Sequence, residues 1–214
     1  VDALGNVIAV RKGRKSPDNK LIIAAHMDEV GFIVTAITPD GTVLFDTVGG
    51  IDSSVISGKR VCIGKNKIKG VIGSLPVHRL SAEKRKKFPE LSSMYIDIGA
   101  DSREQAEKYI NIGDCVYFDS EYIEFGNSFI KSKAIDDRAG CSIMIELIEK
   151  EHEFDTWYCF NVQEEIGLRG SRTSAFRINP DYAIVLESTT ASDIDGVSGA
   201  KRVCELGKGA VVSY

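Results

Sequence analysis

Two adjacent carboxylates, Glu164 and Glu165, are the residues of this 214-residue chain that first suggest chemistry. They follow the apolar, β-forming run Trp157–Val162, which has the length of one buried strand, and Gly167 and Gly170 permit a sharp turn just beyond them. Neighbouring carboxylates repel each other unless a proton or a cation lies between them. The pair therefore suits a bound metal ion, with one glutamate as ligand and the other as base. A solvated acidic turn is the simpler interpretation of such a pair taken alone.

Acidic and imidazole side chains also stand at the ends of other predicted elements. Leu21–Ala25 is a short apolar run, typical of a strand that is covered on both faces in an α/β sheet. In open sheets of that kind, ligands bind at the carboxyl edge of the strands. The polar residues that follow such runs or begin a predicted helix are His26, Asp28, Asp136, Asp137 and Glu187. An aspartate is a routine N-cap, but capping alone would use only one of Asp136 and Asp137.

The combination of side chains predicts a metal site. An imidazole with several carboxylates suits Zn²⁺, Co²⁺ or Mn²⁺ without thiolates. In two-metal hydrolases, ions roughly 3.5–4 Å apart share a bridging carboxylate and a bridging water. Residues two apart on a strand share a face, so Asp28 can accept a hydrogen bond from the imidazole of His26 and orient the ring. Each feature is weak alone, but together they favour a metal centre at a sheet edge.

Composition places the chain among ordinary globular proteins and argues against several function classes. The chain is 43% hydrophobic and 27% charged with a net charge of -4, so nucleic acid is not an expected partner. No apolar run approaches the roughly 20 residues that span a membrane, and no secretory signal is recognisable. The five cysteines form no CxxC pair and are interpreted as reduced, mostly core residues of a cytoplasmic protein.

The order of predicted elements indicates an α/β domain interrupted by a β-rich module. Short strands separated by glycine-rich turns are typical of a small barrel or sandwich. Such strands are predicted at residues 32–37, 42–48, 60–63, 67–72, 93–98 and 115–118. The other predicted elements are strands at 6–11, 21–25, 157–162 and 181–186, a hairpin over 120–131, helices over 103–110 and 139–149, and a helix start at 173–176.

Four blocks of the sequence, in order, are Ala25–Phe32, Ala134–Arg138, Gln163–Gly170 and Leu186–Ala191. They resemble the signature motifs of the tetrahedral aminopeptidases, co-catalytic dinuclear metallopeptidases that include glutamyl and deblocking aminopeptidases. The resemblance spans almost the whole chain, because Gly70–His78 and Ile96–Ala100 of the β-rich module match as well.

The resemblance implies a role for each site residue. His26 and Glu187 would hold one metal ion, Asp136 would bridge two ions, and Glu165 would hold the second. Glu164 would be the general base that activates a water bridging the two ions. The activity implied is removal of N-terminal residues from peptides.

Two further details follow from the same resemblance. Asp28 would orient His26, and the Asp136–Asp137 peptide is cis in many such enzymes. Many relatives carry an aspartate at the position of Glu187, so the glutamate here keeps the carboxylate but reaches one methylene further.

The implied fold is a mixed-sheet α/β sandwich, residues 1–31 and 119–214, interrupted by a PDZ-like β-barrel dimerisation domain, residues 32–118. The implied cofactors are two divalent ions per subunit, Zn²⁺ or Co²⁺, with Mn²⁺ as a third candidate. The implied partners are peptides with a free N-terminus and further copies of the chain, as dimers that assemble into dodecamers.

One ligand of the family pattern is missing. The family's second metal has a further histidine ligand, whereas His78 here lies in the β-rich module and His152 lies in a polar segment where we expect it to be exposed. Elements that open and close the family's catalytic domain are missing too, so we expect a fragment of a longer enzyme. As given, the chain is expected to hold the second metal weakly or not at all and to be inactive.

Two other function classes stay open. One is a non-catalytic self-assembly module with a vestigial acidic cluster. The other is a glycosidase, but that reaction needs two carboxylates about 5–10 Å apart, and the adjacent Glu164 and Glu165 are too close. Chelator-sensitive hydrolysis of aminoacyl nitroanilides would separate the peptidase from the module. The sequence identifies neither the preferred N-terminal residue nor the native metal.

Overall fold

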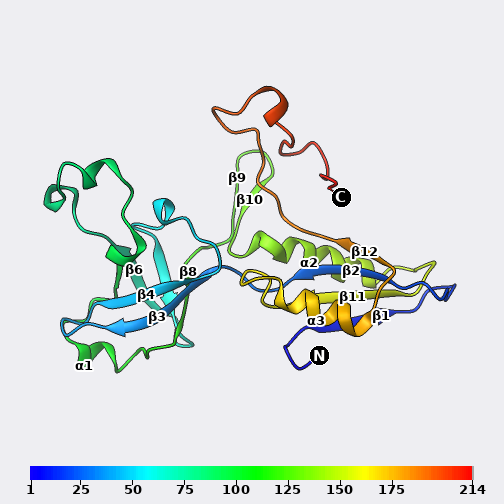
Figure 1. The fold of residues 1–214 in the computed structure, drawn as a ribbon, viewed down its shortest axis with the longest axis horizontal. Coiled ribbons are helices and arrows are strands. Elements are labelled where there is room, and N and C mark those ends of the chain that lie inside the picture. The colour runs from blue at the N-terminus through cyan, green and yellow to red at the C-terminus, as the bar shows by residue number, and fades with distance from the viewer. Residues whose placement is uncertain (214) are drawn as a thin grey trace.

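The computed structural model describes residues 1–213, leaving aside the side chains of Val77 and Lys84. The chain forms two bodies that lie side by side along the long axis, an α/β layer structure and a β-barrel (Figure 1). No helix of the described residues is long and apolar enough to cross a membrane.

The α/β body is built on a mixed four-stranded sheet. Its strands are β1 (Val7–Arg11), β2 (Leu21–His26), β11 (Thr156–Asn161) and β12 (Tyr182–Val185), in the order β1-β11-β2-β12. Strands β11, β2 and β12 are parallel, and β1 is antiparallel to β11. The predicted apolar strands are thus confirmed, with small shifts at their ends.

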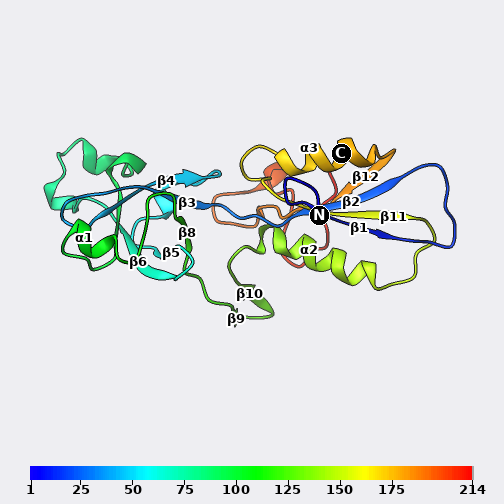
Figure 2. The same cartoon turned by 90° about the horizontal axis from the view of Figure 1, so that it is seen from below.

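Helices α2 (Ile135–Ile148) and α3 (Arg169–Ile178) cover opposite faces of this sheet (Figure 2). Alternate residues of β2 supply the two faces, because successive side chains on a strand point to opposite sides. Ile23 and Ala25 pack in the cluster beneath α2, and Ile22 and Ala24 pack in the cluster beneath α3. The covering of β2 on both faces is as its continuous apolar sequence predicts. Helix α3 begins earlier than expected, at Arg169.

The second body is a closed six-stranded barrel with a core of its own. Large side chains such as Phe32, Ile63 and Ile96 are fully buried inside it. The strands are β3 (Gly31–Ile37), β4 (Val43–Val48), β5 (Arg60–Ile63), β6 (Ile68–Gly73), β7 (Tyr95–Asp97) and β8 (Cys115–Phe118), closed in the order β3-β4-β7-β6-β5-β8. The prediction of a barrel or sandwich is confirmed as a barrel.

The helix expected over residues 103–110 is shorter than predicted. Helix α1 covers Arg103–Ala106, with Ser102 accepting the N–H of Gln105 as its cap. Beyond it the chain continues as a hydrogen-bonded turn, in which the Ile110 N–H donates to the Ala106 oxygen at 3.1 Å. Both Ala106 and Ile110 are fully buried, so this segment packs against the barrel core.

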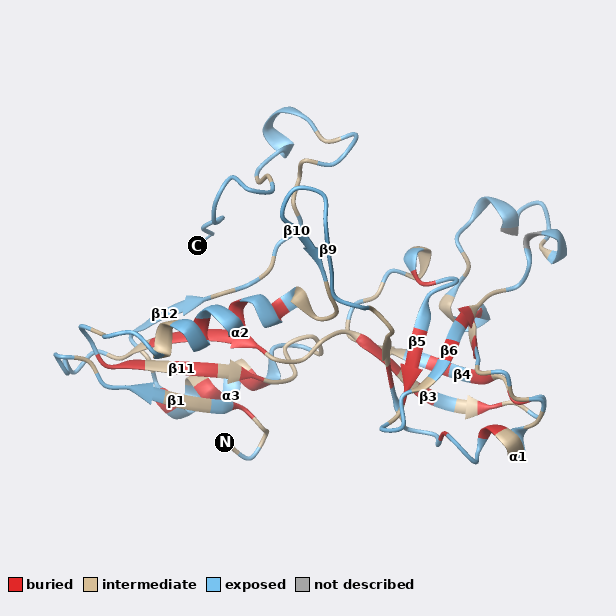
Figure 3. Cartoon of the chain, turned by 180° about the vertical axis from the view of Figure 1, so that it is seen from behind, coloured by how far each residue is buried: buried red, intermediate tan, exposed pale blue. Residues whose placement is uncertain are grey.

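The remaining elements are short and mostly exposed. Strands β9 (Ile123–Phe125) and β10 (Phe129–Lys131) form the predicted hairpin, which stands away from both cores (Figure 3). The single-turn 3₁₀ helices are Ser53–Val55, Val77–Arg79, Lys84–Lys86, Leu91–Ser93 and Gly199–Lys201.

His152 is half-buried, which corrects the expectation of an exposed residue. Its segment folds back on the start of the chain, where the Arg14 N–H donates to the His152 oxygen at 3.0 Å. This contact brings the imidazole against Tyr158, with 2.5 Å between Nε2 and the phenol oxygen. The ring therefore serves the packing of the sheet.

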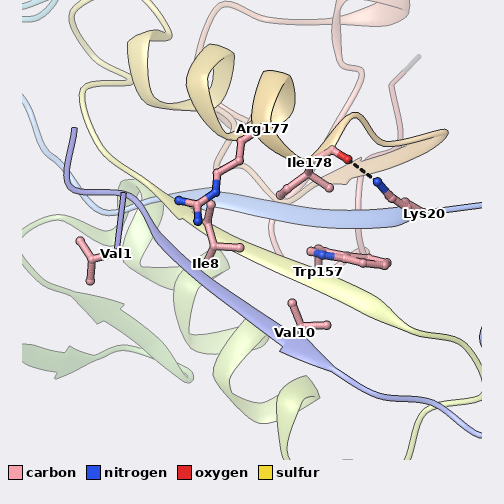
Figure 4. A pocket seen from close by; sticks show the side chains of 7 residues that line it. All are labelled: Val1, Ile8, Val10, Lys20, Trp157, Arg177 and Ile178. Atoms are coloured by element: carbon pink, nitrogen blue, oxygen red, sulfur yellow. Dashed lines mark hydrogen bonds between the residues drawn. The ribbon is translucent and has the colours of Figure 1, made fainter. Parts of the chain in front are cut away.

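A shallow hollow of about 320 Å³ lies on the α3 side of the sheet. Figure 4 shows Trp157 and Val10 at its floor and Arg177 of α3 at its side. Trp157 pairs with Val10 near the start of β11, whereas His26 pairs with Asn161 at the end of that strand. The hollow is thus roughly 13 Å of strand away from the predicted site and is not part of it.

Asn6 joins the start of the chain to the turn that carries the paired glutamates. This fully buried amide accepts the Val162 N–H at 2.9 Å and donates to the Gly170 oxygen at 3.0 Å. Gly170 packs so tightly there that an added Cβ would lie 2.1 Å from the Val162 oxygen and 2.4 Å from Asn6 Oδ1. The turn is therefore fixed at its base by a contact that only glycine permits.

Replacing Gly170 by alanine tests this base of the turn. We expect Gly170→Ala to lower the free energy of unfolding by about 2 kcal/mol or more, because backbone atoms must move to admit the methyl group. Gly50→Ala is the matched control, since nothing lies within 4 Å of its Cβ position, and it should change stability by less than about 0.5 kcal/mol. Urea unfolding measures both; equal effects would contradict this packing.

Thiol reactivity tests the burial of the core cysteines. Burial raises the pKa of the Cys159 thiol to about 12 and also raises the pKa of Cys141. At pH 8 roughly one Cys159 in ten thousand is a thiolate. In an Ellman titration we expect the exposed Cys115 to react first, and Cys62, Cys141 and Cys159 only on unfolding. Cys115→Ser should remove the fast phase, and rapid reaction of every thiol in the folded chain would be inconsistent with this core.

Candidate metal site at the carboxyl edge of the sheet

The carboxyl ends of three parallel strands meet at one edge of the sheet. His26 is the last residue of β2 and pairs with Asn161, the last residue of β11. The paired glutamates follow β11 directly. Glu187 follows β12, whose extension is fixed by the Leu186 N–H donating to the Ala24 oxygen at 2.8 Å. Parallel pairing therefore brings groups from distant parts of the sequence to the same edge.

The imidazole of His26 is the centre of the cluster. The residue is 2% exposed. Its Nε2 lies 3.1 Å from Asp136 Oδ1, 3.5 Å from Glu187 Oε1 and 3.8 Å from Glu164 Oε2. Acids that are distant in the sequence therefore lie within 4 Å of the same imidazole nitrogen.

Asp28 contacts both His26, as the sequence predicts, and the turn that carries Glu164 and Glu165. The Nδ1 of His26 lies 3.1 Å from the Asp28 backbone oxygen and 3.5 Å from its Oδ1, so the ring is oriented from this residue. The two Asp28 carboxylate oxygens also accept the N–H groups of Glu164 and Glu165, at 3.1 and 3.2 Å. One carboxylate therefore fixes both the imidazole and the turn that carries the paired glutamates.

The backbone around this turn has unusual conformations. Gln163 and Leu168, which bracket it, have φ values of 58° and 57°. Left-handed residues other than glycine are uncommon, and they concentrate at functional sites where the surrounding contacts enforce them. The carboxylate of Asp28 supplies such contacts on one side, and the Gly170 N–H to Val162 oxygen bond, 3.0 Å long, supplies one at the base.

Asp137 is a residue whose part in the site the sequence does not reveal. It is buried, and its carboxylate accepts the Gly140 N–H at 3.0 Å and the His26 N–H at 3.3 Å. Asp137 therefore holds the first turn of α2 and attaches the helix start to the end of β2. A Cβ on Gly140 would lie 2.6 Å from that carboxylate, so the sequence signal was the glycine three residues after the aspartate. The Asp136–Asp137 peptide is cis, as the resemblance implies.

Negative charge surrounds His26 and alters its ionisation. Burial acts to lower the pKa of the imidazole, but the nearby charges of Glu187, Glu164 and Asp28 outweigh that effect. The pKa of His26 is therefore raised.

The pKa values of two glutamates in the cluster are also raised. Burial raises the pKa of Glu187 to about 7, and the charge of Asp137 adds to that effect. Burial likewise raises the pKa of Glu165, with the charge of Asp136 adding to it. A site of this kind gains most from a bound cation, which replaces the protons and relieves the repulsion.

The ligand atoms present fit a divalent cation in two overlapping groups. His26, Asp136 and Glu165 form one group, and His26, Asp137 and Glu187 form the other, with the candidate ligand atoms of each group within 4.8 Å of one another. All four predicted metal ligands therefore lie in these groups. Within both, His26 is the single imidazole, so the further histidine of the family pattern has no counterpart among the described residues of the cluster.

Metal affinity should rise steeply with pH. Because the pKa of Glu187 is raised to about 7 and that of His26 is raised as well, both groups bind protons near pH 6 that a cation must displace. We expect Zn²⁺ or Co²⁺ to bind at least about tenfold more tightly at pH 8 than at pH 6, as one displaced proton requires. Calorimetry measures this. Glu187→Gln should flatten the dependence, and equal affinities at both values in the unaltered chain would contradict the arrangement.

Curated relatives match this chain over almost all of its length. The lysyl aminopeptidase of Pyrococcus furiosus is 37% identical over 99% of this chain and 62% of its own length. The glutamyl aminopeptidase of Lactococcus lactis subsp. cremoris is 36% identical over the whole of this chain and 62% of its own length. The chain thus spans less than two thirds of these relatives.

Solved structures share its fold. The aminopeptidase APDkam598 of Desulfurococcus kamchatkensis superposes with a TM-score of 0.90 at 40% identity, covering 98% of this chain and 58% of that one. A Thermotoga maritima protein named as an endoglucanase has a TM-score of 0.79 at 42% identity, covering 97% and 61%. PhTET1-12s, solved as a dodecamer, has a TM-score of 0.76 at 31% identity, covering 90% and 59%.

The sequence model of one family matches nearly the entire chain. The M42 glutamyl aminopeptidase model aligns with residues 5–214. This match confirms the resemblance expected from the four motif blocks. The chain belongs to the M42 glutamyl aminopeptidase family.

Proposed function

We propose that this chain carries the metal centre of an aminopeptidase that removes N-terminal residues from peptides with the help of two divalent cations. The observation that supports the proposal is the convergence of one buried imidazole and several carboxylates at the carboxyl edge of the sheet. Membership of the M42 family and the names of the relatives point to the same reaction.

The proposed ligands follow from the positions of the acids. His26 and Glu187 would hold one ion, Asp136 would bridge, and Glu165 would hold the second. Glu187 Oε1 lies 3.5 Å from His26 Nε2, and Asp136 Oδ1, at the start of α2, lies 3.1 Å from the same nitrogen. The ions would be Zn²⁺ or Co²⁺, with Mn²⁺ as a third candidate, because carboxylates and imidazole accept all three.

The proposed chemistry assigns the proton transfers to Glu164. When bound, the cations would acidify a shared water and polarise the carbonyl of the peptide bond to be cleaved. Glu164 would accept a proton from the attacking water and then donate it to the amine nitrogen that leaves. Its Oε2 lies 3.8 Å from His26 Nε2 and its side chain is 28% exposed, so substrate can reach it. Asp28 would keep it in place through the Glu164 N–H.

We also propose that the barrel is a separate, PDZ-like unit, residues 32–118, that serves self-association into dimers and dodecamers. The closed strand order and independent core support a separate unit. The dodecameric state of PhTET1-12s supports the assembly. A cytoplasmic location stays a prediction from the absence of CxxC pairs and the buried, unpaired cysteines.

Two alternatives compete with the peptidase. An endoglucanase would be consistent with the name of one solved relative. A glycosidase, however, uses two carboxylates that flank one bond, and an imidazole within 4 Å of four acids would have no part in that reaction. A non-catalytic assembly module would be consistent with the barrel alone. It gives no function to the two hydrogen bonds that the N–H groups of Glu164 and Glu165 donate to Asp28.

Metal stoichiometry tests the ligand assignment in the chain as given. The second ion lacks an imidazole ligand in the cluster, so we expect one ion or fewer to be retained per 214-residue chain after dialysis, and no hydrolysis of aminoacyl nitroanilides. Elemental analysis gives the count. Two tightly held ions per chain would show that the ligand set is complete without a further histidine.

Substitution of the two glutamates separates base from ligand in the natural protein that contains this sequence. Glu164→Gln should lower kcat about 100-fold or more, because the general base is lost, while metal content is kept. Glu165→Gln should lower metal content itself. Glu146→Gln is the control, since that residue is exposed on α2 and pairs with Lys150. Full activity of the Glu164→Gln variant would show that Glu164 is not the general base. Hydrolysis of cellulose but not of nitroanilides by the unaltered protein would favour the endoglucanase.

A further inference from the structure

A hollow of about 540 Å³ opens directly beside the proposed metal site. Asp136 and Glu165 line one side of it, and both bodies of the protein supply the remaining walls. Gly49 and Gly50 follow β4 of the barrel. A Cβ added to Gly49 would lie 3.3 Å from the Cβ of Glu165, so Gly49 packs against that residue. The barrel is therefore in contact with the glutamate turn, and the hollow has the volume of a small-molecule pocket.

Beyond the proposed metal ligands Asp136 and Glu165, the walls of this hollow combine apolar side chains, two serines and two charged residues. Val30, Phe118 and Ile135 contribute its apolar surface, and each of them is only partly buried, so each has surface free for a ligand. The two charged residues that are not proposed metal ligands are Glu29 and Lys133, and Ser120 and Ser132 are the uncharged polar residues. With Asp136 and Glu165 engaged by metal, such a lining would favour an apolar group if the charges of Glu29 and Lys133 were already neutralised.

Glu29 and Lys133 neutralise each other. The Lys133 ammonium forms an ion pair with the Glu29 carboxylate, and their side chains are only 33% and 23% exposed. The same ammonium lies 4.8 Å from the centroid of the Tyr117 ring, which adds a cation–π contact. Neither charge has another role in the metal site, and neither residue is among the candidate metal ligands.

We propose that this hollow binds the side chain of a substrate residue adjoining the cleaved bond, and that the Glu29–Lys133 pair makes it select an uncharged, apolar side chain. The proposal rests on the proposed aminopeptidase function and adds the substrate class. A charged substrate side chain in the hollow would have to leave water for a wall whose charges are already paired. An apolar side chain meets no such cost and contacts Val30, Phe118 and Ile135.

The family relationship does not by itself fix this preference. One relative is named for lysyl substrates and the other for glutamyl substrates. A wall pair of opposite charges is a simple determinant, because removing either partner leaves a single charge of known sign facing the ligand.

The test uses two single variants of the natural protein that contains this sequence, each loaded with Co²⁺. Glu29→Gln leaves the ammonium of Lys133 unpaired, so kcat/KM for glutamyl relative to leucyl substrate should rise about tenfold. Lys133→Met leaves the carboxylate of Glu29 unpaired, so the ratio of lysyl to leucyl substrate should rise by a similar factor. The double variant should return to the original preference for leucyl substrate.

Two substrate series distinguish the residues on either side of the bond. Aminoacyl nitroanilides vary the first residue, and alanyl dipeptides vary the second. A shift in either series supports the hollow as a subsite and says which residue it takes. Lys69→Met is the matched control, because Lys69 pairs with Asp119 at 2.7 Å on the barrel and does not line this hollow; its ratios should stay unchanged.

Three results would overturn the inference. If Glu29→Gln and Lys133→Met hydrolyse peptides with the original ratios in both series, the pair does not select substrates, although the aminopeptidase function stands. If both lose activity on every substrate equally and the double variant does too, the pair is structural. If the unaltered protein hydrolyses no substrate with Zn²⁺, Co²⁺ or Mn²⁺, the proposed function fails and this inference fails with it.

Discussion

Repulsion between carboxylates is the constraint on which the rest of this structure depends. Six acids gather around one imidazole, namely Asp28, Asp136, Asp137, Glu164, Glu165 and Glu187. Two of them are held by the protein itself, because Asp28 and Asp137 each accept two backbone N–H groups. Such hydrogen bonds favour the charged form of a carboxylate, although burial outweighs them at Asp137 and raises its pKa. The other four acids lack such a pair of backbone donors among the described residues, and Asp136, Glu165 and Glu187 among them supply candidate ligand atoms.

The fold meets that constraint through its strand order and its short connections. Parallel pairing of β11 and β12 with β2 brings three strand ends together, and α2 brings its own start to the same edge. Asn6 and Gly170 fix the base of the glutamate turn from the opposite end of the chain. The barrel adds a wall through Gly49, which is packed on Glu165. Both bodies of the chain therefore contribute to one site and to the hollow beside it.

Much of this arrangement could be predicted from the sequence, because its signals are local. Continuous apolar runs predicted the buried strands, glycines predicted the turns, and carboxylates just after those strands predicted where the site lies. The parts that could not be predicted depend on contacts between distant segments. Asp28 was expected to act on His26 alone, and its bonds to the glutamate turn depend on the register of β2 with β11. The roles of Asp137 and Asn6 and the burial of His152 depend on long-range contacts of the same kind.

The most direct test of the metal centre is anomalous diffraction at the zinc or cobalt edge from crystals of the natural protein. The account predicts an ion about 2.0–2.2 Å from His26 Nε2 and from an oxygen of Asp136 or Glu187, with a second ion at Glu165 about 3.5–4 Å away. An ion bound elsewhere on the protein, or an empty cluster at millimolar metal concentration, would contradict it.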